Sequence, residues 1–214
     1  MKRRDFSVGL AGAGLSLAGV ARAQGGPAEG RDYLRLSTPA ATALAGTGKK
    51  VEVVEFFWYG CPACNAFEPA LESWVSKLPE DVLFRRVPVG FSVPHQVHQK
   101  LYYTLEHLGQ LDKLHKRVFA AMHVQRLRLM TEKDIVAWAK DQGLNGEEFA
   151  GLFRSMTVDS KGRQARALSD AYRVDGVPSI GVQGRYFTSG SLAGRADRVL
   201  SVTDFLIQRA RQGA

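Results

Sequence analysis

Residues 51–78 read VEVVEFFWYGCPACNAFEPALESWVSKL, and this stretch determines the fold of the chain. Its first portion, from Val51 to Trp58, is almost wholly apolar and rich in β-branched and aromatic residues, which predicts a strand buried on both faces. From Pro62 onward the apolar residues recur at helical spacing, and proline suits the first turn of a helix. The two cysteines therefore stand where a buried strand meets the start of a helix.

The rest of the chain extends this pattern into an α/β fold. Residues 82–89 predict a second strand, and residues 95–172 have helical periodicity throughout most of their length. Val177-Pro178 then precedes a predicted hairpin over residues 180–188, and a final helix is expected over residues 195–209. The predicted order is strand, helix, strand, helical block, hairpin and helix, which indicates an α/β sandwich with an all-helical insertion.

The first 23 residues have the features of a cleavable export signal. A basic start at residues 2–4 precedes an apolar run over residues 6–20, and Ala21-Arg22-Ala23 offers a small-x-small cleavage site. The run is about 15 residues long, shorter than the roughly 20 that span a bilayer, so an uncleaved anchor is the weaker alternative. We expect cleavage near Ala23 and export to an oxidising compartment, by the general or the twin-arginine route.

The composition fits one globular unit. The chain has 214 residues, of which 45% are hydrophobic and 23% charged, and this argues against disorder and coiled coil. The formal charge is +8, but the basic residues are spaced along predicted helices without forming a dense run. We therefore expect no nucleic-acid partner.

Cys61 and Cys64 are the only cysteines, so they cannot staple distant segments together. A helix N-terminus carries unpaired amide protons and about half a positive charge, and both stabilise a thiolate. Cys61 lies nearest that end, so it should have the lower pKa and act as the attacking or leaving group. Cys64, one turn further on, would be the buried resolving thiol.

Two other interpretations of the cysteine pair remain open. One is half of a zinc site, which needs about four ligands and for which His95 and His98 are the only closely spaced histidines. The other is an inert bridge, which would stabilise the fold little because it spans so few residues. Redox chemistry fits the pair better, and we expect neither a metal nor an organic cofactor.

Glu55 is a further candidate, because in the alternation of a strand it shares a face with apolar neighbours. A carboxyl buried there would have a raised pKa and would be able to exchange protons with Cys64. A structural ion pair with a lysine or arginine, or a place at an open sheet edge, is the alternative.

Pro178 lies in a loop just before the predicted hairpin. Most X-Pro bonds are trans, but this position is a candidate for the cis form. A cis bond there would leave the Val177 backbone free to pair with an extended substrate segment across from Cys61, as in strand addition.

With these residues in place, the sequence resembles the DsbA-type disulfide oxidoreductases of the bacterial periplasm. The segment from Val54 to Pro69 is similar to their active-site region, and residues 174–186 resemble their cis-proline loop and hairpin. The resemblance implies a thioredoxin fold with an inserted all-helical subdomain. The expected segments are a signal peptide (1–23), a first thioredoxin-like segment (24–93), the helical subdomain (94–165) and a second thioredoxin-like segment (166–214).

The resemblance also implies a role for each candidate residue: Cys61 nucleophile, Cys64 resolving cysteine, Glu55 buried acid, Pro178 cis proline, and Val177 and Pro62 substrate-binding. The chain would donate its disulfide to reduced or unfolded exported proteins in the periplasm, as a monomer that a DsbB-like membrane protein re-oxidises. An isomerase or a reductant on the same fold, and a non-catalytic binder of unfolded clients, are the alternatives. Arg85 or Arg86 would stand near the place of a basic partner to the acid, a role that the resemblance does not assign.

One residue departs from the family pattern. DsbA sequences have histidine between the proline and the second cysteine, where this chain has Ala63. Without that imidazole the Cys61 thiolate loses one stabilising group, and a rise of one unit in its pKa would lower the reduction potential by ~30 mV. We therefore predict an oxidant that is milder than the family pattern implies.

Overall fold

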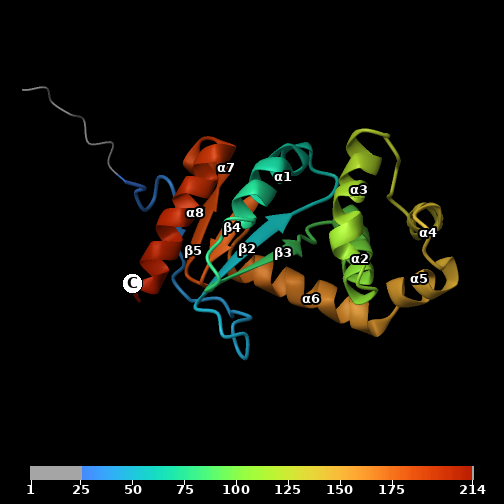
Figure 1. Ribbon diagram of the computed structural model, residues 1–214, viewed down its shortest axis with the longest axis horizontal. Helices are drawn as coiled ribbons and strands as arrows, with labels where there is room; N and C mark the ends of the chain where they lie inside the picture. The colour runs from blue at the N-terminus through green and yellow to red at the C-terminus, as the bar shows by residue number, and fades with distance from the viewer. Residues whose placement is uncertain (1–25, 214) are drawn as a thin grey trace, which may run out of the picture.

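The computed structural model describes residues 26–213, in which a five-stranded mixed sheet carries helices on both faces (Figure 1). The strand order is β1-β5-β4-β2-β3, with β2 and β3 parallel and the other neighbours antiparallel. The strands are β1 (Leu34–Arg35), β2 (Val51–Phe57), β3 (Val82–Pro88), β4 (Ser179–Val182) and β5 (Tyr186–Ser189). The predicted signal peptide and its cleavage near Ala23 lie outside the described residues.

Eight helices complete the described region of the chain. They are α1 (Pro62–Val75), α2 (Val93–His107), α3 (Leu111–His123), α4 (Glu132–Asp141), α5 (Gly146–Phe153), α6 (Met156–Ala171), α7 (Gly190–Ala193) and α8 (Ala196–Arg211). The predicted order of strand, helix, strand, helical block, hairpin and helix is confirmed, and the thioredoxin-like α/β class with it. Within residues 26–213, no helix is both long and apolar enough to cross a membrane.

The helices α2 to α6 lie together at one end of the sheet (Figure 1). Helix α6 runs from this helical region back to the sheet, where Tyr172 at its end packs on Phe56 with ring centroids 5.2 Å apart. The boundary proposed at residue 165 falls inside this helix. One continuous helix therefore connects the helical region to the sheet.

Strand β2 is buried at all seven positions because hydrophobic layers cover both of its faces. Val51 and Val53 belong to the core beneath α1 and α8, while Val54 and Phe56 belong to a second core that extends into the helical region. This double burial explains why the strand is apolar at five of its seven positions, with Glu52 and Glu55 as the exceptions. It also places the end of β2, and the cysteines that follow, between the two cores.

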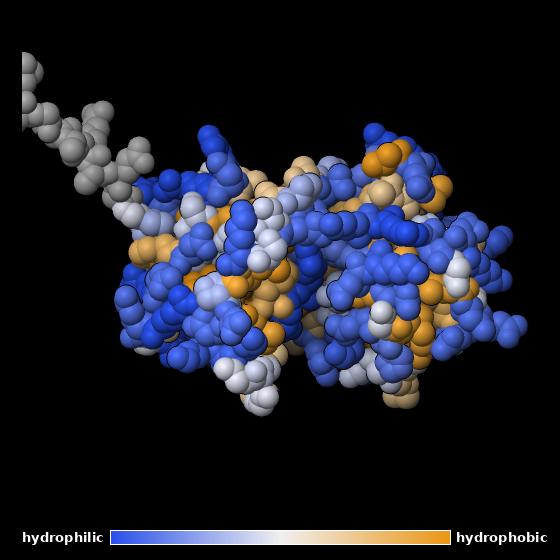
Figure 2. Space-filling view, viewed as in Figure 1, coloured by the Kyte–Doolittle hydropathy of each residue, from blue (hydrophilic) through white to orange (hydrophobic). Residues whose placement is uncertain are grey.

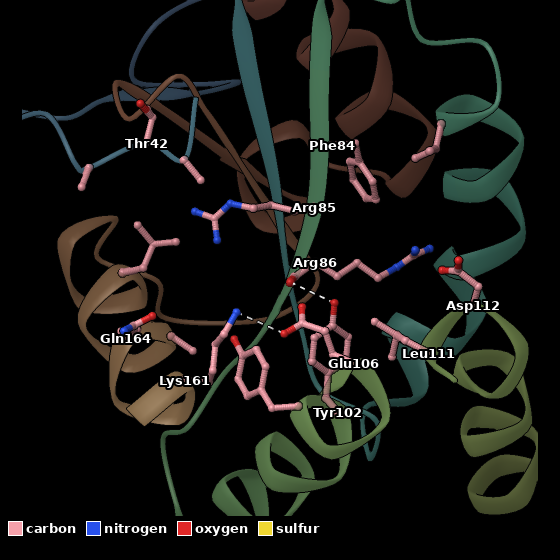
Figure 3. Close-up of a pocket in the computed structure, with 16 residues that line it drawn as sticks. Thr42, Phe84, Arg85, Arg86, Tyr102, Glu106, Leu111, Asp112, Lys161 and Gln164 are labelled. Carbon is pink, nitrogen blue, oxygen red and sulfur yellow. Dashed lines mark hydrogen bonds and ion pairs between the residues drawn. The ribbon is translucent and has the colours of Figure 1, made fainter. Parts of the chain in front are cut away.

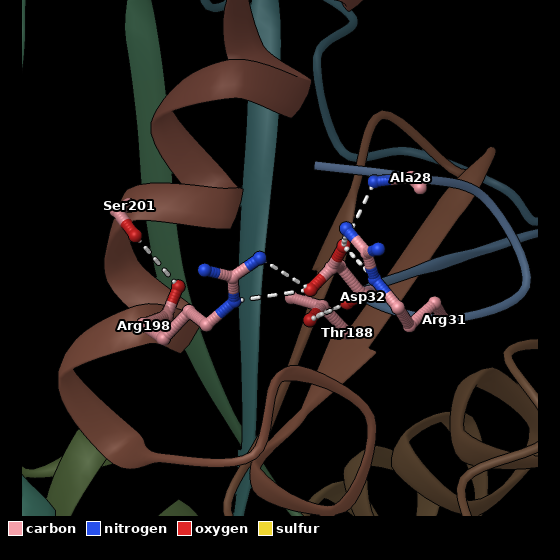
Figure 4. Close-up of polar contacts among 6 residues, drawn as sticks. All are labelled: Ala28, Arg31, Asp32, Thr188, Arg198 and Ser201. Atoms are coloured by element: carbon pink, nitrogen blue, oxygen red, sulfur yellow. Dashed lines mark hydrogen bonds and ion pairs between the residues drawn. The ribbon is translucent and has the colours of Figure 1, made fainter. Parts of the chain in front are cut away.

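Strand β1 is an element that the sequence did not predict, since two residues carry no periodicity. It is held by Asp32, a carboxylate only 3% exposed that accepts hydrogen bonds from the Ala28 amide at 2.9 Å and from Arg198 Nε at 3.0 Å (Figure 4). Thr188 of β5 donates its hydroxyl to the Asp32 carbonyl at 2.7 Å. The N-terminal segment is thereby attached to both the sheet and α8.

Asp32→Asn is expected to lower the melting temperature by a few degrees at pH 7. The hydrogen bond from Ala28, and then those from Arg198 and Arg31, hold the pKa of this carboxyl well below its ordinary value of 3.8. The stabilisation is therefore present above pH 3.8 and is lost as the pH falls through the lower folded-state pKa. Thermal denaturation followed by circular dichroism at pH 7 and pH 2.5 checks this, and an equal difference at both values would contradict it.

Candidate active site

The two cysteines lie at the first turn of α1. Cys61 is the N-cap residue, Pro62 occupies the first helical position, and the Cys64 amide donates to Cys61 Sγ at 3.3 Å. Both cysteines are free thiols; Cys61 is partly exposed, whereas Cys64 is fully buried. A substrate can therefore reach the first sulfur and not the second.

This geometry separates the pKa values of the two thiols. The hydrogen bond from the Cys64 thiol lowers the pKa of Cys61 to about 6, with further help from the amides of Cys64 and Ala63 and from the charge of His123. Burial raises the pKa of Cys64 far above its usual range, and the hydrogen bond to Cys61 and the negative charge of the Cys61 thiolate raise it further. At neutral pH the reduced pair therefore consists of a thiolate at Cys61 and a thiol at Cys64.

The loop before β4 faces the exposed sulfur. The Val177–Pro178 peptide bond is cis, and Cys61 Sγ lies 3.5 Å from the Val177 carbonyl oxygen. The following residue, Ser179, pairs with Phe56 of β2, which sets the position of the loop relative to the cysteines. The structure thus brings Val177 and Pro178 to the same place as Cys61, although more than 100 residues separate them in sequence.

Glu55 lies in β2 with no exposed surface, and Arg86 Nε donates to its Oε2 at 3.1 Å. Burial raises the pKa of this carboxyl, the charge of Glu68 raises it further, and Arg86 offsets only some of the rise. Glu55 lies near enough to Cys64 that its charge contributes to the raised pKa of that thiol. Glu55 is therefore a buried acid with a raised pKa, close enough to Cys64 for its ionised form to disfavour a thiolate there.

The basic partner of Glu55 is Arg86, because the parallel register sets Glu55 opposite Arg86 and Val54 opposite Arg85. Arg85 lies on the other side of β3 and donates from Nε to Glu52 at 2.9 Å. Figure 3 shows the two arginine side chains leaving β3 in opposite directions, with Arg86 directed toward Asp112. Periodicity within one strand cannot reveal this pairing, since it depends on the register between two strands.

Sequence reasoning missed three polar residues beside Glu55: Glu68 on α1, Tyr59 after β2 and His115 on α3. Arg86 Nη2 also makes a close ion pair with Glu68, and His115 lies between Glu68 and the Tyr59 hydroxyl. The spacing of Glu68 four residues after Cys64 puts both on one face of α1, which is the signal that was available. For His115 no local signal existed, because it arrives from a separate helix.

Aromatic side chains border the cysteine loop, which is residues 58–61 between β2 and α1. Trp58 packs on His95 at 4.3 Å between ring centroids, and His123 Nε2 lies 2.7 Å from the Tyr59 carbonyl oxygen, so α2 and α3 both border the loop. Figure 2 shows hydrophobic atoms at the end of α3, one of several hydrophobic areas on a mostly hydrophilic face. Exposed large apolar residues lie just before and at the start of α2, Phe91 and Val93, and in the segment after α3, Val124, Leu127 and Met130.

The histidines considered as zinc ligands have other surroundings. His95 Nδ1 lies 2.6 Å from the Ser92 hydroxyl, and His98 is buried with Nε2 2.7 Å from the Leu129 carbonyl oxygen. Over residues 26–213, no three His, Cys, Asp or Glu side chains are grouped so that they could share a metal ion.

The sheet, the cysteine pair at a helix start and the facing cis-proline loop together define a thiol:disulfide oxidoreductase of the thioredoxin fold. A family model described as a DSBA-like thioredoxin domain matches residues 80–198. The thiol:disulfide interchange protein DsbA of Azotobacter vinelandii is 39% identical over 99% of both chains, and that of Pseudomonas aeruginosa is 38% identical over 93% of both. The chain belongs to the DsbA family.

Solved structures agree with this assignment. The crystal structure of Pseudomonas aeruginosa DsbA is similar with a TM-score of 0.80 and 36% identity, covering 86% of this chain and 94% of that one. The oxidoreductase DsbA from Xylella fastidiosa matches with a TM-score of 0.80 and 29% identity, covering 87% of this chain and 98% of that one. The predicted family, fold and thiol:disulfide interchange activity are thereby confirmed.

The Cys61 thiolate is expected to titrate near pH 6 in the reduced protein, as measured by its absorbance at 240 nm. Cys64→Ala removes the thiol that stabilises it most, so the pKa should rise toward the ordinary value of 9.0. Cys61→Ser serves as the control and should abolish the transition. A titration that Cys64→Ala leaves unchanged would contradict the hydrogen bond between the thiols as the main cause.

Proposed function

We propose that the chain donates a Cys61–Cys64 disulfide to reduced or unfolded proteins that are exported to the periplasm. The observation that carries this proposal is the difference between the two sulfurs, of which one is exposed with a pKa of about 6 and the other is buried. An exposed sulfur that is a stable anion is a good leaving group, so a disulfide held through it transfers readily. The expected signal peptide supports export.

In the first step a substrate thiolate attacks Cys61 Sγ, the Cys61–Cys64 bond breaks, and Cys64 leaves with the electron pair. Cys64 would then be an anion in an apolar core, which is unfavourable. Glu55 supplies its carboxyl proton to the Cys64 sulfur and removes that charge. The result is a mixed disulfide, a neutral Cys64 thiol and an ionised Glu55.

In the second step another substrate thiolate attacks the substrate sulfur of the mixed disulfide and expels Cys61 as a thiolate. The substrate has lost two electrons and gained a disulfide, and the enzyme holds both electrons as its reduced pair. Glu55 takes a proton back from the solvent. The amides at the start of α1 stabilise the departing anion. No cofactor takes part in either step, and a DsbB-like membrane protein then re-oxidises the pair.

Substrate binding uses the surface around Cys61. The Val177 backbone lies beside the sulfur and next to Pro178, while Pro62 follows Cys61, and this favours an extended peptide without defined sequence. The apolar residues at 91–93 and 124–130 suit unfolded chains that expose hydrophobic side chains. A single chain holds all of these groups, so the proposed reaction needs no second subunit.

Of the alternatives to disulfide donation, a non-catalytic binder of unfolded clients makes the prediction that differs most at the active site. Cys61→Ser separates the binder from the enzyme, because it removes the attacked sulfur and leaves the apolar surface intact. We expect complete loss of the oxidative refolding of a reduced client, with client binding by fluorescence anisotropy within a factor of about 2 of wild type. Residual refolding activity in this variant would contradict the proposal.

Glu55→Gln is expected to slow the first step by roughly tenfold or more at pH 7, because the amide cannot supply a proton. Expressed per concentration of the attacking thiolate, the wild-type rate constant should fall as the pH rises through the raised pKa of Glu55, since the protonated acid is the active form. The variant should lack that alkaline limb. Stopped-flow tryptophan fluorescence during reduction by a thiol from pH 5 to pH 10 measures both effects, and superimposable profiles would exclude Glu55 as the donor.

A further inference from the structure

Two buried carboxyls share one arginine beneath the cysteines. Glu55 is 0% exposed and Glu68 is 5% exposed, and Arg86 donates to both. Two carboxylates at one buried site repel each other, and a single guanidinium balances only one of them. One of the two therefore holds a proton at neutral pH, and the surroundings decide which.

The surroundings of the two acids are unequal. Oε1 of Glu68 meets Arg86 Nη2 and also lies 3.3 Å from Nε2 of His115, whereas Glu55 has only the contact of its Oε2 with Arg86 Nε at 3.1 Å. Oε1 of Glu55 and Oε2 of Glu68 both lack a hydrogen-bond partner among the described residues, so the acids differ only at the oxygens that face Arg86. The His115 contact does not have the geometry of a full hydrogen bond, but a second polar nitrogen this close to a carboxylate still favours ionised Glu68 over ionised Glu55.

Tyr59 orients the imidazole that makes this difference. Its hydroxyl lies 2.8 Å from His115 Nδ1, and burial raises the pKa of Tyr59, so the hydroxyl stays protonated and donates. A neutral imidazole that accepts at Nδ1 carries its hydrogen on Nε2, the atom nearest Glu68. The rings of Phe57 and Phe119 lie 5.3 Å from the imidazole and restrict its rotation.

We propose that His115 is a positioning residue that decides which buried carboxyl holds the proton: it donates to Glu68, keeps that group ionised and leaves the proton on Glu55. This inference rests on the proposed role of Glu55 toward Cys64 and names the residue that prepares it. Burial raises the pKa of Glu68, but His115 and then Arg86 outweigh burial, and the net pKa is lowered. Burial lowers the pKa of His115, so its ring is neutral.

Other charged or titratable groups also face His115, and they come from every element packed against it. A cavity of about 260 Å³ opens beside the imidazole. The groups are Glu68 and Glu72 from α1, Arg86 from β3, Tyr59 from the cysteine loop, Tyr102 from α2, and Asp112 and Lys116 from α3 itself. Of these, Glu68 is the acceptor within reach of Nε2, so the proposal concerns that contact alone.

His115→Phe tests the proposal, because it keeps a ring in the core and removes the donor. The reduced protein, labelled with ¹³C at the glutamate carboxyls, is titrated by NMR. We expect the Glu55 transition to move down by roughly one pH unit or more and the Glu68 transition to move up. His115→Gln retains an amide donor and should restore the wild-type order, whereas Lys113→Gln, on the exposed side of α3, is the matched control and should change neither.

Kinetics provide the second measurement. The alkaline limb of the thiol-reduction rate should move to lower pH with the Glu55 transition in His115→Phe and return in His115→Gln. Tyr59→Phe keeps the ring but removes the hydroxyl that fixes the His115 tautomer. It should therefore shift the glutamate transitions and the alkaline limb in the same direction as His115→Phe, by a smaller amount. If His115→Phe does not fold, Tyr59→Phe tests the role of His115 in its place.

Glutamate transitions that match wild type in the phenylalanine variants would overturn the proposal, and so would a shift that His115→Gln shares. If Glu55→Gln has the wild-type pH profile, then the proposed function of Glu55 fails whatever His115 does. If Glu55→Gln loses the alkaline limb while His115→Phe keeps it in place, only the inference about His115 fails.

Discussion

The rest of the site depends on the contact between the Cys61 sulfur and the first turn of α1. The Cys64 amide lies 3.3 Å from that sulfur, and the Cys64 thiol stabilises the same anion from below. Because this stabilisation exists only when the disulfide is open, it favours the reduced enzyme over the oxidised one. An enzyme that is more stable in its reduced form tends to transfer its disulfide to a substrate.

That contact also creates a difficulty at the second sulfur. Cys64 is buried, so each time the disulfide opens a charge would form in the core between the two hydrophobic layers. In the proposed mechanism, the polar groups beneath α1 supply the proton that removes this charge. They come from β2, β3, α1, α3 and the cysteine loop, and they meet only because the parallel register brings Arg86 beside Glu55 and α3 crosses close to α1. In the proposed mechanism the helical region therefore takes part in the chemistry as well as covering the sheet.

The elements that carry the cysteines were predictable from sequence, because a doubly buried strand and an amphipathic helix have strong local patterns. Burial of Glu55 was also predictable, because this acid lies in an almost wholly apolar strand. The partner of that acid was not, since Arg85 and Arg86 differ only in which side of β3 they occupy. His115 and Tyr59 lie more than 50 residues apart, and β1 is held by Asp32 and α8 and has no pattern of its own.

Ala63 makes the strength of the oxidant the most informative property of this chain. The missing histidine predicts a milder oxidant than the DsbA pattern implies, while the lowered pKa of Cys61 still predicts an oxidant. The equilibrium reduction potential of the purified protein against glutathione measures this balance directly. A value well above the thioredoxin range of about −270 mV is predicted, and a value near that range would contradict the stabilised thiolate.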